Sequence, residues 1–144
     1  MPPPGLYVHA LGFLDAAEVV RQEQGRTRSA TLEFPIRSLY SHAWEGVLKA
    51  CLLKQGWSVQ DLKRRIGHDL ERAFVEVDKN TFAVLRLEAA EQIMPVMNLY
   101  HRSRFYFYPG TGLFPMLLLD DVSKMSERLR LDRPTAASVF GLAG

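Results

Sequence analysis

The stretch from Leu39 to Leu70, LYSHAWEGVLKACLLKQGWSVQDLKRRIGHDL, decides the fold class of this chain. It contains a long amphipathic segment, a glycine, a short segment with a good helix start, a second glycine, and the beginning of another helical pattern. Glycine supplies the left-handed backbone conformation with which many helices end. The order of these signals predicts three successive helices joined by tight turns. It does not by itself identify a reaction.

The long segment has apolar residues in pairs about every four positions, which is the spacing of one helix face. Pro35 suits its first turn, because the N–H that proline lacks would be unpaired there in any case. Gly56 is the expected end of the helix. The apolar stripe is wide enough to pack on more than one neighbouring helix, or on a second subunit. Its members are Ile36, Leu39, Tyr40, Ala43, Trp44, Val47, Leu48, Cys51 and Leu52.

The segment after Gly56 has the signals of a short capped helix. Ser58 and Asp61 have the spacing of a capping box, in which each side chain bonds the backbone N–H of the other residue. Trp57 and Leu62 stand where a hydrophobic staple would place its two apolar residues. Gly67 is the expected end. The sequence therefore predicts a short helix between two longer ones.

Helical spacing of apolar residues also recurs elsewhere, whereas no stretch shows the alternation that is typical of a strand. Asn80 is placed to cap one of these helices, and Pro95 should kink or divide the same helix near Met94. The pattern predicts an all-α protein. The further helical stretches are 12–24, 68–77, 80–100 and about 114–131.

The composition is that of an ordinary globular protein. The 144 residues are 47% apolar and 24% charged, with a net charge of +2, which is compatible with an anionic partner without requiring one. We expect one domain over 1–144, with a core at about 12–131 and irregular tails at 1–10 and 132–144. No segment has the pattern of a signal peptide or a membrane span, so we expect a cytoplasmic protein without a membrane partner.

The sequence offers no metal site or redox pair that spacing alone can identify. Cys51 is the only cysteine and lies on the apolar face of a predicted helix, where a buried, inert thiol is expected. His68 has no second histidine within five positions. Asp69 suits the first turn of a helix, where the helix dipole favours a negative charge. We therefore expect His68 to form hydrogen bonds between helices, and we predict no metal and no cofactor.

Three segments carry a resemblance to a known family. The sequence AWEGVLKACLLKQG at 43–56, followed by a short capped helix and GHDL at 67–70, resembles the HEPN family, the higher eukaryotes and prokaryotes nucleotide-binding domains. The segment 99–109, with its tyrosines, arginines and proline, is similar as well, and the likeness covers about 12–110. It implies an up-and-down bundle of four to five main helices, with the short capped helix between the second and third long ones.

The resemblance also implies work on nucleotides or RNA, often as a dimer and beside a nucleotidyltransferase-like partner protein. Some members of the family are metal-independent endoribonucleases, including toxins, whereas others bind or act as scaffolds without catalysis. We expect a binding domain without catalysis of its own. A metal-independent endoribonuclease is the first alternative, and a protein-interaction scaffold is the second.

The family's ribonuclease motif, an arginine followed by four to six residues and a histidine, has one match in Arg37 and His42. A neutral histidine can take the proton of a ribose 2′-hydroxyl, and an arginine can stabilise the negative charge of the phosphorane. However, positions five apart lie about 140° apart around a helix, so these two side chains should not share a face. His42 or His101 remains the candidate base of the endoribonuclease alternative.

The segment 100–108 is the expected binding site, because it alternates flat rings with cations. Such a surface can stack bases and hold phosphates without reading their sequence, although the same rings could instead be core or dimer contacts. A homodimer is expected through the wide stripe of the helix that begins near Pro35. The residues predicted to bind a nucleotide or RNA are Tyr100, His101, Arg102, Arg104 and Tyr106.

Overall fold

The computed structural model describes residues 3–81, 90–103 and 119–131, and every regular element within these ranges is a helix. The predicted all-α class is therefore confirmed for the described part of the chain. The elements are α1 (Pro3–Thr27), η1 (Ala30–Leu32), α2 (Glu33–Lys54), α3 (Val59–Asp61), the single π-helical turn η2 (Leu62–Ile66), α4 (Leu70–Glu76), α6 (Ala90–Ser103) and α7 (Leu119–Leu131).

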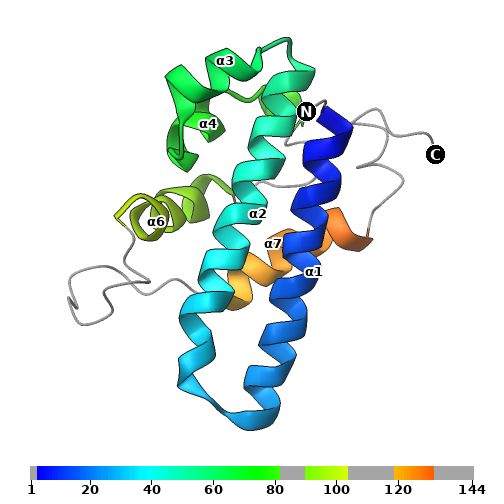
Figure 1. Cartoon of the computed structure of the whole chain (residues 1–144), viewed down its shortest axis with the longest axis vertical. Helices are drawn as coiled ribbons and strands as arrows, with labels where there is room; N and C mark the ends of the chain where they lie inside the picture. Colours follow the sequence, from blue (N-terminus) through cyan, green and yellow to red (C-terminus); the bar gives the residue numbers. More distant parts are fainter. Residues whose placement is uncertain (1–2, 82–89, 104–118, 132–144) are drawn as a thin grey trace.

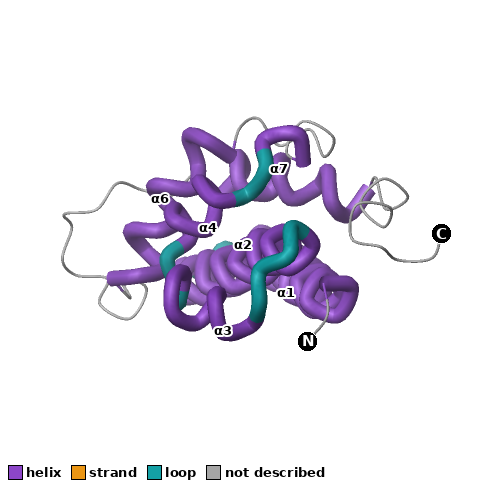
Figure 2. Tube along the Cα trace, turned by 90° about the horizontal axis from the view of Figure 1, so that it is seen from above, coloured by secondary structure: helices purple, strands orange, loops and turns teal. Residues whose placement is uncertain are grey.

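The helices α1 and α2 form a long antiparallel hairpin that runs the length of the molecule (Figure 1). Seen from above, α4, α6 and α7 lie on one side of this hairpin (Figure 2). The two hairpin helices approach closely at Gly46, where an added Cβ atom would lie 3.2 Å from the Cβ atom of Ala10. A larger residue at this position would push the helices apart, so the glycine serves close packing here.

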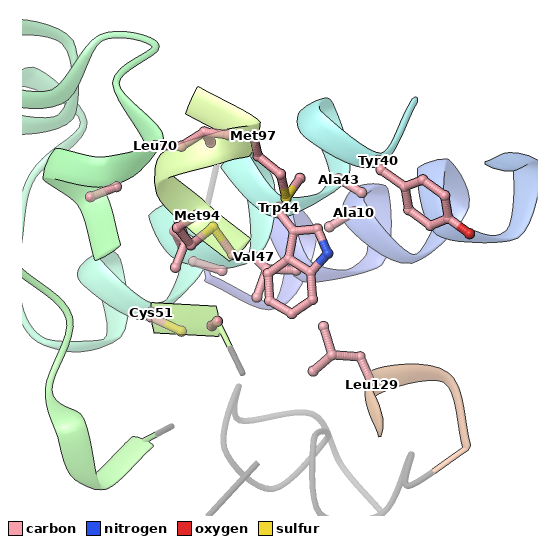
Figure 3. Packing of buried hydrophobic residues seen from close by; sticks show 14 of the residues in the cluster. Ala10, Tyr40, Ala43, Trp44, Val47, Cys51, Leu70, Met94, Met97 and Leu129 are labelled. Carbon is pink, nitrogen blue, oxygen red and sulfur yellow. The ribbon is translucent and has the colours of Figure 1, made fainter. Parts of the chain in front are cut away.

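The helix α2 is the centre of the core, and its Trp44 lies among residues of several other helices (Figure 3). Apart from Leu39, the residues of its apolar stripe are at most 2% exposed. The prediction that the stripe packs on more than one neighbour is confirmed, because α1, α4 and α6 all contact α2. Apart from the partly buried Leu39, the stripe is thus covered by other described helices of the same chain.

Polar contacts attach α7 to both helices of the hairpin. Trp44 donates from its indole Nε1 to the hydroxyl of Ser126 at 3.0 Å. The carboxylate of Glu18 on α1 accepts from the hydroxyls of Tyr40 at 2.6 Å and Ser123 at 2.7 Å. Burial and the bond to Glu18 raise the pKa of Tyr40 to about 12. These bonds join three helices whose apolar residues would otherwise pack with little directional preference.

The capping box and the two glycine turns predicted around the short helix are confirmed. The Ser58 hydroxyl accepts from the Asp61 backbone N–H, and the Asp61 carboxylate accepts from the Ser58 backbone N–H, both at 3.0 Å. Gly56 and Gly67 have φ angles of 101° and 59°, in the left-handed region that favours glycine. Leu62 is buried, and Trp57 packs against the core.

The amino-terminal prediction was wrong for residues 3–10, because α1 begins at Pro3 rather than Gly12. Proline is tolerated in a first helical turn. Tyr7 and Ala10, each 1% exposed, extend the apolar spacing that continues at Leu14. Phe13, by contrast, is 40% exposed.

Three predicted helix details also need correction. Pro95 does not divide the helix α6, which continues through it, whereas a kink at this residue remains a prediction. The exposed position of Pro95 leaves the carbonyl freed one turn earlier accessible to water. Residues 79–81 are already helical, and the carboxylate of Asp78 accepts the Asn80 N–H at 2.9 Å. Asp78, rather than Asn80, therefore caps the start of this helix. The helix α4 begins at Leu70 rather than His68. The predicted tail at 132–144 lies outside the described residues.

Candidate functional site

Three of the four histidines of the chain lie around one carboxylate, although they are far apart in the sequence. The helix α2 supplies His42 and Glu45, the turn between η2 and α4 supplies His68, and α6 supplies His101. We refer to these four residues as the histidine cluster.

The GHDL turn is held in place by bonds at both of its ends. Gly67 allows the chain to reverse, and the Asp69 carboxylate caps α4 by accepting the Arg72 N–H at 3.0 Å. Asn98 on α6 accepts the Leu70 backbone N–H at 2.8 Å and donates to the Asp69 carboxylate at 3.0 Å. Because Asn98 lies one helical turn before His101, these bonds fix α6 relative to His68.

Glu45 is the centre of the cluster. Its Oε1 atom lies 2.8 Å from Nδ1 of His68 and 2.9 Å from Nε2 of His101, while Lys49 lies 3.6 Å from its Oε2 atom. Burial would raise the pKa of Glu45, but the hydrogen bonds from His101 and His68 and the charge of Lys49 outweigh it and lower the pKa to about 2. The carboxylate is therefore ionised at neutral pH and accepts from both rings.

The two histidines bound to Glu45 differ in their access to solvent. The His101 side chain is 3% exposed, whereas the His68 side chain is 77% exposed. Since Nδ1 of His68 donates to Glu45, Nε2 is the nitrogen that remains for a ligand. The expected hydrogen bond of His68 between helices is thereby confirmed.

His42 is the third imidazole of the cluster. Its ring centroid lies 5.2 Å from that of His101, in an edge-on arrangement, and 5.8 Å from that of Phe13. Partial burial lowers the pKa of His42, and the neighbouring His101 lowers it further against the opposing effect of Glu45. A neutral ring is thus favoured at neutral pH, which is the state that can accept a proton.

The structure does not bring Arg37 to His42. The Arg37 side chain is 1% exposed, forms an ion pair with Glu33, and lies 5.6 Å from the ring of Phe34. His42 is exposed on a different face of α2. The helical-face argument from the sequence is confirmed, and the match to the arginine–histidine motif does not form a catalytic pair.

The predicted binding segment lies only partly within the described residues. His101 is buried in the histidine cluster, where its ring contacts those of His42 and His68. Tyr100 and Arg102 belong to α6, but their side chains are outside the described part. Arg104 and Tyr106 fall outside it altogether.

An exposed basic segment, Lys63–Arg64–Arg65, is separated from the GHDL turn by Ile66 alone. The guanidinium of Arg65 lies 4.0 Å from the ring centroid of Trp57, a cation–π contact that holds the charge in place. The carboxylate of Asp61 forms the capping box and offsets part of this charge, because Arg64 and Arg65 attract it. The segment still has a net positive charge three to five positions before His68.

The sequence analysis missed the cluster because it considered only near neighbours along the chain. His68 and His101 are 23 and 56 positions from Glu45, and only helix packing brings them together. A signal was present, since Glu45, His68 and His101 all lie in the three segments that carry the family resemblance. The prediction for Cys51 was correct: burial raises the pKa of its thiol to about 12.

No protein family matches this chain, and no curated protein or solved structure is detectably similar to it. Among the described residues, none of the helices is both long and apolar enough to cross a lipid bilayer.

Proposed function

We propose that this chain is a HEPN-like helical domain that binds RNA or a nucleotide beside the histidine cluster, without catalysis of its own. The observation that carries the proposal is the position of His68: an exposed imidazole, oriented by the partly buried carboxylate of Glu45 and close in sequence to a basic segment. The resemblance of AWEGVLKACLLKQG and GHDL to the family supports the same class of ligand.

A phosphate is the ligand group that this surface fits best. Nε2 of a protonated His68 can donate to a phosphate oxygen, and Lys63 and Arg64 can neutralise its charge. The predicted residues Tyr100, Arg102, Arg104 and Tyr106 belong to the proposal as the part that would stack bases and contact further phosphates. Arg102 follows His101 directly in α6, so the helix itself leads from the cluster to that segment.

Fluorescence anisotropy with a short labelled single-stranded RNA, and in parallel with ATP and GTP, tests the proposal. The titrations are made in EDTA and over a range of salt concentrations. The double variant Lys63→Gln with Arg64→Gln should weaken RNA binding, and the logarithmic salt dependence should fall by about 0.7 for each phosphate that the variant no longer neutralises. His68→Ala should weaken binding as well. A second double variant, Arg102→Ala with Arg104→Ala, tests the late segment.

The matched control removes the same number of charges at the other end of the hairpin. Arg26 and Arg28 are exposed at the connection between α1 and α2, opposite α3 (Figure 1). Arg26→Gln with Arg28→Gln should leave the affinity close to that of the wild type. If this control weakens binding as much as Lys63→Gln with Arg64→Gln does, the attraction is a property of net charge, and the proposed site is wrong.

A metal-independent endoribonuclease is the second candidate, favoured by the neutral His42 ring beside His101. One imidazole could take the proton of the 2′-hydroxyl while His68 protonates the leaving oxygen. Incubation of RNA with a high concentration of protein in EDTA tests this reaction. Cleavage that disappears in His42→Ala would establish it, and intact RNA would remove it.

A homodimer and a nucleotidyltransferase-like partner protein remain parts of the proposal. Because the stripe of α2 is covered within the chain, a second copy would have to use another surface, and α1 exposes Val8, Phe13 and Val19. Analytical ultracentrifugation distinguishes monomer from dimer. If neither RNA nor nucleotides bind, the protein-interaction scaffold becomes the better interpretation.

A further inference from the structure

We propose that Glu45, His68 and His101 form a binding site for a divalent transition-metal ion of the zinc class. The inference goes beyond RNA binding and does not depend on it. One donor atom of each residue, Oε1 of Glu45, Nδ1 of His68 and Nε2 of His101, lies within 4.8 Å of the other two.

The distances suit an ion after a small outward movement of the side chains. The contacts between Glu45 and the two histidines measure 2.8 and 2.9 Å. Donor atoms about 2.1 Å from a tetrahedral zinc ion lie about 3.4 Å apart. Each ring therefore has to move from the carboxylate by roughly half an ångström. The two histidine nitrogens, which lie within 4.8 Å of each other, have to come to about the same 3.4 Å spacing, and rotations about side-chain bonds provide both movements. The ion would replace the two hydrogen bonds to Glu45 with three coordination bonds. Each imidazole would then carry its proton on the nitrogen that does not bind the ion, which is Nε2 of His68 and Nδ1 of His101.

The backbone positions of the three donors are fixed before any ion binds. Glu45 lies in the middle of the long helix α2, with Lys49 one turn later near its second oxygen. Asn98 binds both the backbone of Leu70 and the side chain of Asp69, and so holds the turn that carries His68 against α6. Preorganisation of this kind lowers the cost of assembling a site, because ligands need not be ordered on binding.

The types of donor select the class of ion. Two imidazoles and one carboxylate suit zinc, iron, cobalt or nickel, whereas magnesium and calcium prefer sites made of oxygen. Three protein donors also leave one position of a tetrahedral ion for water or for a ligand. His68 is largely exposed, so an ion can reach the site from solvent. His42 stands beside this site without being one of the three donors.

The alternative is that the cluster only joins helices. Glu45 already accepts two hydrogen bonds and lies near Lys49, so its charge is compensated without an ion. Lys49 on the second oxygen also weakens the pull of the carboxylate on a cation. The two interpretations differ in one measurable property, which is the affinity of the metal-free protein for zinc.

Isothermal titration of EDTA-treated, desalted full-length protein with Zn²⁺ tests the site, without RNA present. The wild type should bind one ion per chain, with a dissociation constant on the order of 1 μM or lower. His68→Ala and Glu45→Gln should each weaken binding by about 100-fold or more, since even partners in the outer shell are worth 10–100-fold. His9→Ala, which removes an exposed histidine that is not one of the three donors, should bind as the wild type does.

Cobalt provides an independent readout, because Co²⁺ in a four-coordinate site absorbs strongly in the visible range. The absorption should appear in the wild type and in His9→Ala, and should be lost in His68→Ala. Circular dichroism of each variant confirms that it is folded, and His68→Ala should be, because its ring is largely exposed. The proposal is overturned if the wild type binds no zinc at micromolar concentration, or if all variants bind it equally. Because RNA binding is measured in EDTA, neither result affects that proposal.

Discussion

Asn98→Ala is the substitution that tests the assembly of the site most sharply. Asn98 provides the described hydrogen bonds between α6 and the start of α4: it accepts the buried Leu70 N–H at 2.8 Å and donates to Asp69 at 3.0 Å. Alanine keeps the helix and removes both bonds. Leu70 stands at the start of α4, where its N–H has no partner within the helix.

The magnitude follows from these two bonds. An unsatisfied buried N–H costs about 1–3 kcal/mol, and a bond to a charged group contributes about 1.5–3 kcal/mol when it is buried. The bond to Asp69 is only partly buried and is counted at the lower end, which gives a total loss of about 2.5–4.5 kcal/mol in the free energy of unfolding. For a chain of this size, each kcal/mol lowers Tm by about 3 °C, so Tm should fall by roughly 8–14 °C.

Thermal and urea unfolding, followed by circular dichroism, measure this loss. Gln92→Ala is the matched control on α6, because Gln92 is exposed and such substitutions usually change stability by less than about 0.5 kcal/mol. Asn98→Ala should also weaken RNA binding, because it releases the turn that carries His68. A loss of stability below about 1 kcal/mol would refute this reasoning, since the unsatisfied N–H alone should cost that much.

Three further substitutions or treatments have defined outcomes. Ser58→Ala should lower the free energy of unfolding by about 0.5–2 kcal/mol, because the capping box with Asp61 is removed; equal urea midpoints would contradict this. Cys51 should react with a thiol reagent only on unfolding, because its pKa is raised by burial; rapid labelling of native protein would show otherwise. Burial raises the pKa of Glu18, but the hydrogen bonds from Tyr40 and Ser123 outweigh this effect, so the pKa in the folded protein is lowered. The ionised Glu18 therefore stabilises the folded protein above pH 4.5, and this contribution is lost as the pH falls through the folded pKa. Tyr40→Phe should therefore destabilise more at pH 7 than at pH 2, and an unchanged difference would count against the Glu18 contact.

Local signals in the sequence predicted local structure well. The capping box at Ser58 and the glycines at 56 and 67 depend on a few neighbouring residues, and all three appear as expected. The burial of the apolar stripe of α2 was also predicted, because the stripe follows from residue spacing within a single helix. The start of α1 was missed because three prolines suggested irregular chain, whereas Tyr7 and Ala10 gain enough burial to keep residues 3–10 helical.

The candidate site could not be predicted in the same way, because it depends on how the helices pack. Nothing in the spacing of His68 and Glu45 indicates that the two meet across 23 positions. His101 appeared in the sequence as part of an aromatic and basic surface, yet it is buried against Glu45. The separation of Arg37 and His42 was the one part that the sequence could predict. Both residues belong to one helix, and helix geometry alone places them on different faces.

Nuclear magnetic resonance of uniformly ¹⁵N-labelled protein, which reports on the histidine ring nitrogens and on the backbone amides, tests the proposed binding region most directly. Titration with a short RNA in EDTA should shift the ring nitrogens of His68 and His42, and the shifts should shrink with rising salt. Ring signals that stay unchanged while RNA binds, with shifts confined to amides at the connection between α1 and α2, would contradict the account.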